Sequence, residues 1–104
     1  MKAYTIYVGL TDRHGKDHTD ENHMDLLRDN IVEILEDNGI EGATIYEGTG
    51  VWHREEEHCF VIYVSHVQEA YIEPLCQDLA EHFDQESVGY HESPALKLVD
   101  HPYL

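Results

Sequence analysis

The 104-residue chain has little positive charge, since six Lys and Arg residues stand against 22 Asp and Glu residues, for a formal net charge of -16. No Lys or Arg occurs between Glu55 and Leu96. Such a surface repels phosphate backbones and anionic lipid headgroups, which argues against direct binding to nucleic acids or membranes. The acidity is typical either of a protein adapted to high salt or of one whose partner is basic.

Long apolar runs and cysteine pairs are also lacking. No stretch of about 18 apolar residues could span a membrane, and the N-terminus lacks the apolar segment of a signal peptide, so we expect a cytoplasmic protein. Two cysteines, Cys59 and Cys76, are too few for a disulfide framework and are expected to be buried thiols. A hydrophobic fraction of 41% suits a single domain over residues 1–104, with 91–104 as a short C-terminal extension.

Hydrophobic periodicity predicts alternating strands and helices. Strands are expected over 3–10, 43–53, 59–64 and 87–91, and helices over 20–38 and 67–83. Tyr4, Ile6, Val8 and Leu10 should share the buried face of the first strand, leaving Thr5, Tyr7, Val61 and Tyr63 on the other. The order βαββαβ predicts an α+β, ferredoxin-like sandwich, a four-stranded antiparallel sheet with two helices on one face.

Three local features leave alternatives open. Gly48 and Gly50 indicate a bulge or bend in the second strand. Pro74 requires either a bent second helix or one that begins near Ile72 with proline in its first turn. Residues 95–99 alternate and could add a fifth strand or pair with a neighbouring subunit.

No catalytic signature stands out, and the sequence favours a non-enzymatic protein without a cofactor. The serines and cysteines lie in no activating motif. Nine histidines raise the question of a metal, but no spacing defines a site, and His53 and His58 are only weak candidates. If the chain were an enzyme, His53, His58 or Glu57 would be its acid–base group.

The glycine-rich segment of the second strand is the predicted ligand site. A lone G-x-G is a weak phosphate-loop signal, because the third glycine and the lysine are missing. Arg54 is one of only six basic residues and lies beside the single tryptophan. These are the residues expected to bind a ligand, and an anionic ligand if one binds at all: Gly48, Thr49, Gly50, Trp52 and Arg54.

The stretch from Gly42 to Gly50 resembles the G-A-T-V-x-x-G-x-x-G segment of PII-like signalling proteins. Tyr7-Val8-Gly9 before a polar loop, and a first helix ending near Asn38-Gly39, fit the same pattern. The resemblance implies a ferredoxin-like trimer that binds nucleotides or other small effectors between subunits. The chain departs from that family in its short connection from Trp52 to Glu57 and in its few phosphate-neutralising cations.

A second resemblance is to small uncharacterised bacterial and phage proteins with a G-x-G-x-W hairpin motif. The motif is Gly48 to Trp52 here, and Phe83 followed by Gln85-Glu86-Ser87-Val88 matches the segment that opens the last strand of that family. The two resemblances together span roughly residues 3 to 90.

Three functional hypotheses follow. The first is a non-enzymatic regulatory domain of PII-like type that forms a dimer or trimer and binds a small-molecule effector or a partner at the hairpin. The second is an acidic protein of viral or mobile-element origin that inhibits a basic protein partner or mimics nucleic acid. The third is a small ferredoxin-like enzyme.

Overall fold

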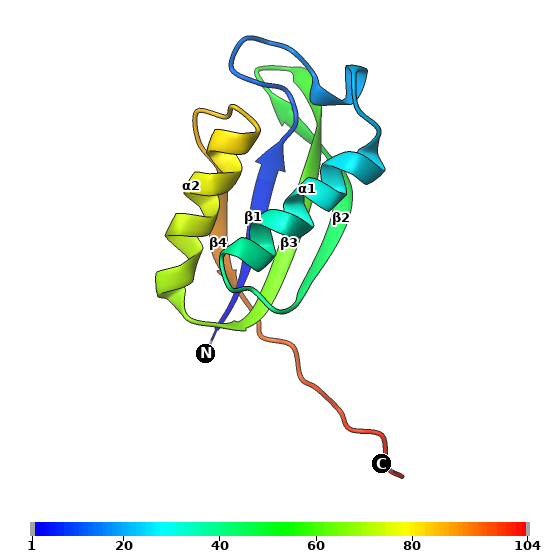
Figure 1. Ribbon diagram of the computed structural model, residues 1–104, viewed down its shortest axis with the longest axis vertical. Coiled ribbons are helices and arrows are strands. Elements are labelled where there is room, and N and C mark those ends of the chain that lie inside the picture. The colour runs from blue at the N-terminus through cyan, green and yellow to red at the C-terminus, as the bar shows by residue number, and fades with distance from the viewer. Residues whose placement is uncertain (1, 104) are drawn as a thin grey trace.

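The computed structural model describes residues 2–103, except for the side chain of Trp52. Its strands form one antiparallel sheet in the order β2-β3-β1-β4, and both helices cover the same face of that sheet (Figure 1). This arrangement confirms the predicted α+β, ferredoxin-like sandwich. The elements are β1 (Lys2–Gly9), η1 (His18–Asp20), α1 (Met24–Asp37), β2 (Ala43–Trp52), β3 (Glu55–Val67), η2 (Glu69–Tyr71), α2 (Ile72–His82) and β4 (Gly89–Ser93).

The core lies between the sheet and the helices, because alternate residues of the central strands point toward the helices. The sheet contributes Tyr4, Ile6 and Val8 from β1 and Phe60, Ile62 and Val64 from β3, and the helices contribute Leu27, Ile31, Leu35, Leu75 and Leu79. Burial of each such side chain contributes roughly 1.5–3 kcal/mol to folding. The predicted buried face of β1 is confirmed.

The opposite face of the sheet carries no helix, and we call it the open face. Thr5 of β1 lies there between Tyr63 of β3 and His91 of β4, as the strand register requires. Tyr7 is exposed on this face, whereas Val61 is nearly buried. The predicted partition of residues between the two faces is therefore confirmed.

The predicted bulge in β2 is wrong. Gly48 pairs with Cys59 and Gly50 with Glu57 in an unbroken register, so the hydrogen-bond ladder with β3 outweighs the conformational cost of two glycines. A two-residue turn of His53 and Arg54, with φ of 50° and 65°, closes the hairpin. Residues 55–57, expected in the turn, instead begin β3.

Other element boundaries also differ from the prediction. Helix α1 begins at Met24 rather than near residue 20, because His18–Asp20 forms a separate 3-10 turn. Helix α2 begins at Ile72, which places Pro74 in the first turn, where a missing N–H costs little.

The C-terminal region departs from the expected strands as well. Strand β4 ends at Ser93, before Pro94, and begins two residues later than predicted. Residues 95–99 form no strand within the described part of the chain, and the C-terminal segment extends away from the sheet (Figure 1).

Candidate functional site

Three segments meet at the end of the sheet where the β2–β3 hairpin closes, and they enclose an open cleft of about 490 Å³. These are the loop that follows β1, the first residues of β3 and the connection from α2 to β4. The lining residues are Thr11, Asp12, Arg13, Gly15, Glu55, Glu56, Glu57, Gln85, Glu86 and Ser87. Its volume falls within the range of small-molecule sites in proteins.

Glu57 and Gln85 converge above Gly9 in this cleft. A Cβ atom built on Gly9 would lie 2.8 Å from Oε1 of Glu57 and 2.9 Å from Oε1 of Gln85. Glycine is therefore the residue that leaves room for both side chains over β1. The backbone N–H of Thr11 donates to Oε2 of Glu57 at 3.3 Å, which helps to fix the carboxylate.

Hydrogen bonds to two carbonyl groups set the orientation of the Gln85 amide. Its Nε2 atom donates to the carbonyl oxygens of Thr11 at 2.7 Å and Phe83 at 3.2 Å. Because carbonyl groups only accept, the amide oxygen must point the other way, toward Glu57. The two acceptor oxygens therefore lie close together over Gly9, where a cation or an N–H donor that contacts both would satisfy them.

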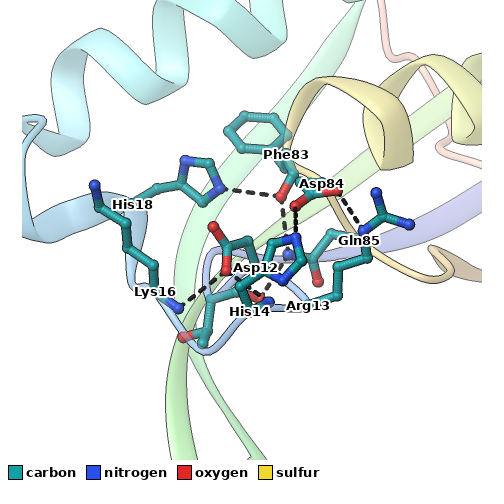
Figure 2. Close-up of polar contacts among 9 residues, drawn as sticks. Asp12, Arg13, His14, Lys16, His18, Phe83, Asp84 and Gln85 are labelled. Atoms are coloured by element: carbon teal, nitrogen blue, oxygen red, sulfur yellow. Dashed lines mark hydrogen bonds and ion pairs between the residues drawn. The ribbon is translucent and has the colours of Figure 1, made fainter.

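The loop after β1 is tied to the end of α2, which makes this part of the cleft wall well defined (Figure 2). Nε of Arg13 lies 2.6 Å from Oδ1 of Asp84, and Nε2 of His18 donates to the Phe83 carbonyl at 3.0 Å. Asp84 adopts a left-handed φ of 50° immediately after the helix, so the chain turns back toward β1 and presents Gln85 to the cleft.

Asp12 organises the same loop from within. Its Oδ1 atom accepts the backbone N–H groups of Lys16 at 3.0 Å and His14 at 2.9 Å. These hydrogen bonds, led by that from Lys16, lower the pKa of the Asp12 carboxyl below its ordinary value. Asp12 therefore stays ionised and adds a negative charge to the rim.

The charge of the cleft is strongly negative. Asp12, Glu55, Glu56, Glu57 and Glu86 line it, and its one cationic lining residue, Arg13, is paired with Asp84. Burial, followed by the charge of Glu57, raises the pKa of the Cys59 thiol on the next open-face position of β3. The cleft therefore favours cationic ligands and repels phosphates.

The predicted ligand residues lie on the hairpin beside this cleft, and their role stays a prediction. Gly48 and Gly50 are on the open face, where a Cβ on Gly48 would come within 3.2 Å of Sγ of Cys59. Arg54 is exposed in the turn, and Trp52 belongs to β2, although its side chain lies outside the described residues. The two glycines add no side chain of their own to the open face beside Cys59 and Glu57.

The histidines do not assemble into a metal centre in the described part of the chain, where no group of three His, Cys, Asp or Glu residues could hold an ion. His53 lies in the turn and His58 in β3, and His58 and Cys59 occupy opposite faces of that strand.

Sequence reasoning did not identify Gly9 or Thr11 as part of the site, and it gave Gln85 no role in ligand binding. Gln85 did carry a signal, since it belongs to the segment shared with the G-x-G-x-W proteins. Gly9 and Thr11 carried none, because their importance arises from the register that places them opposite the start of β3.

This architecture is the ferredoxin-like fold. No sequence-family model and no curated protein matches the chain. Among solved structures, it is similar to a phage SAM lyase in complex with S-methyl-5'-thioadenosine, with 18% identity and a TM-score of 0.61 over 88% of this chain and 79% of that one.

Two further solved structures support the resemblances seen in the sequence. One is CPII, a nitrogen regulatory PII-like protein from Thiomonas intermedia K12 bound to ADP, AMP and bicarbonate, with 17% identity and a TM-score of 0.52 over 94% of both chains. The other is a DUF3240 family protein from Shewanella baltica OS155, with 14% identity and a TM-score of 0.55 over 96% of both chains. At these identities the likeness establishes the fold, and the fold includes both enzymes and small-molecule-binding regulators.

Within the described residues, no helix combines the length and apolar character needed to cross a membrane.

Proposed function

We propose that the chain is a self-associating, small-molecule-binding domain whose hairpin-end cleft takes a positively charged adenosine derivative, namely a sulfonium nucleoside of the S-adenosylmethionine type. The observation that carries this proposal is the pair of inward-facing acceptors, Glu57 and Gln85, above Gly9. A cationic or ammonium group of the ligand that contacts both oxygens would supply the positive charge or the N–H donor that these two acceptors favour.

The adenosine part of the proposal rests on the similar structures. The phage enzyme holds S-methyl-5'-thioadenosine and CPII holds ADP and AMP, so an adenine nucleoside is common to both. The sign of the ligand charge rests on this chain, because five carboxylates line the cleft. The sequence placed any anionic ligand at the hairpin beside Arg54, and the charge of the cleft argues for a cationic ligand instead.

The hairpin residues complete the proposed site. Gly48 and Gly50 give the open face a surface that a flat ring can approach closely, and Trp52 and Arg54 follow at the end of the hairpin. Thr49 pairs with His58 and its side chain points to the other face, so it would contribute its backbone alone. The interpretation as a regulator follows the PII-like resemblance, in which binding without turnover alters the protein's association with a partner.

Cleavage of the bound sulfonium nucleoside is the second candidate function. It is favoured by one specific observation: the Glu57 carboxylate is held by the Thr11 N–H beside a glycine surface, where a substrate can reach it. In this alternative Glu57 is the acid–base or charge-stabilising group.

Calorimetric titration with S-adenosylmethionine, S-adenosylhomocysteine and ATP tests the binding proposal. We expect S-adenosylmethionine to bind most tightly, since only it carries the sulfonium charge, and ATP not to bind. Glu57→Gln should lower that affinity at least tenfold, because a hydrogen bond to a charged group contributes about 1.5–3 kcal/mol.

Glu56→Gln is the matched control, because it removes the same charge from the adjacent position of the same cleft. We expect its effect to be less than threefold. Equal losses in the two variants, or no binding of S-adenosylmethionine by the parent chain, would show that the proposal is wrong. Chromatographic detection of S-methyl-5'-thioadenosine after incubation separates the enzyme from the regulator.

A further inference from the structure

The segment that follows β4 is anchored to the open face and then leaves it. We call residues 94–103 the C-terminal tail. The Tyr63 hydroxyl donates to the Pro94 carbonyl at 2.5 Å, and the Leu96 N–H donates to Oγ of Ser65 at 3.3 Å. These bonds carry the tail from β4 to β3, at the end of the sheet opposite the hairpin, after which it projects from the body (Figure 1).

The projecting part of the tail is apolar but exposed. Leu98 is 76% exposed, Val99 91% and Tyr103 90%. Each apolar side chain left in water forgoes the stabilisation that burial brings. Residues 95–99 also retain the alternating pattern of a strand, so the tail has the composition of a strand without a strand partner in the described structure.

The edge of the sheet beside the tail is a surface to which a further strand can be added. Strand β2 is an edge strand of ten residues that pairs with β3 along its whole length and has no second partner in the described part of the chain. It contains no proline, and its one charged residue, Glu47, is paired with Arg28 at 2.9 Å. A long, regular edge of this kind is a template for an added strand.

The position and the charge of the tail both favour its pairing with the β2 edge of a second copy. Leu96 lies with Gly42, Ala43 and Thr44 around one surface pocket, so the tail leaves the body beside the start of β2. Lys97 and Asp100 are the only charged side chains of the tail and they cancel, whereas the whole chain carries -16. A second acidic copy therefore repels the tail little.

We propose that residues 95–99 of one copy add as a fifth strand to the free edge of β2 in a second copy. The proposal rests on the self-association in the proposed function and not on its ligand. In the assembled form, Leu98 and Val99 lie against the partner's sheet edge instead of in water, and the backbone N–H groups of the tail enter the ladder.

Light scattering after size-exclusion chromatography tests this pairing, using Lys97→Pro/Leu98→Pro as the breaking variant. Adjacent prolines remove the donors on both sides of the added strand, and because the tail contributes little to the core, the fold should persist by circular dichroism. We expect the variant to fall toward the mass of one chain, 12.1 kDa, while the parent and the control Tyr103→Pro remain multimers.

Hydrogen exchange at residues 97–99 completes the test. These amides should be protected in the parent multimer and exchange freely in the proline variant. A variant that keeps the parent's mass overturns the pairing of the tail while leaving self-association intact. A monomeric parent overturns both, including the case in which its tail amides are protected by its own β2. Ligand titration judges the proposed binding function separately.

Discussion

The two faces of the sheet are formed by the same strands, but their side chains are buried to different extents. On the helix-covered face, Ile62 and Val64 are completely buried within a continuous apolar core. On the open face, the alternate positions hold Tyr7, which is 46% exposed, and the glycines at 9, 48 and 50. The comparison teaches that the continuous apolar core lies on one side of the strands. The other side buries separate residues such as Thr5 and Val61 and presents more accessible positions, among them Tyr7.

Matched valines on β3 provide the largest expected contrast between the faces. Val64→Ala removes two methyl groups from a fully buried site, which should cost about 2–3 kcal/mol once the cavity is included. Val61→Ala, on the open face and 8% exposed, should cost about 1 kcal/mol, because that site can relax toward solvent. Urea unfolding of both variants measures the difference, and equal losses would contradict the assignment of the core to the helix side.

Matched glycines sharpen the description of the open face. Gly9→Ala brings a methyl group within 2.8 Å of Oε1 of Glu57, so both Glu57 and Gln85 must move. We expect about a tenfold loss of affinity for S-adenosylmethionine, equivalent to about 1.4 kcal/mol. Unfolding free energy should change less, because the obstructed atoms are the ends of flexible side chains. Gly89→Ala, which meets no atom within 4 Å, is the control, and it should bind as the parent does.

The smallest expected effect concerns the buried thiol of Cys76. Burial raises the pKa of the Cys76 thiol on α2 to about 11. The folded chain therefore keeps this proton while the unfolded thiol loses it near its ordinary value of 9.0, so stability is lost as pH rises from about 9 toward 11. Cys76→Ala should flatten this part of the pH profile by up to about 1 kcal/mol at pH 10. An unchanged slope in thermal unfolding at pH 8–10 would contradict the assignment.

Most of the fold was predictable because its signals are periodic. Alternation in β1 and the apolar stripes of the helices follow directly from burial on one face. The errors fall where local and long-range effects compete. Gly48 and Gly50 favour a bulge locally, but their ladder to β3 keeps β2 in unbroken register, and a sequence cannot reveal that ladder before the register is known.

The candidate site was predictable only in part for a related reason. The hairpin drew attention because glycine and tryptophan are conspicuous in the sequence, and Glu57 was considered for its chemistry. Gln85 and Thr11, however, join Glu57 across 28 and 46 residues of chain, so their convergence depends on strand pairing and on the turn at Asp84. The ligand charge that we propose likewise depends on the five carboxylates that the fold gathers around one cleft.

The negative rim of that cleft also has a kinetic consequence. A field produced by clustered carboxylates raises the local concentration of cations and speeds their arrival, and added salt weakens the effect. The same field does not hold a neutral molecule. Conversion of a bound sulfonium to a thioether would remove the positive charge of the ligand. The carboxylates would then attract the charged substrate but not the neutral product, so the field would speed substrate binding without slowing product release.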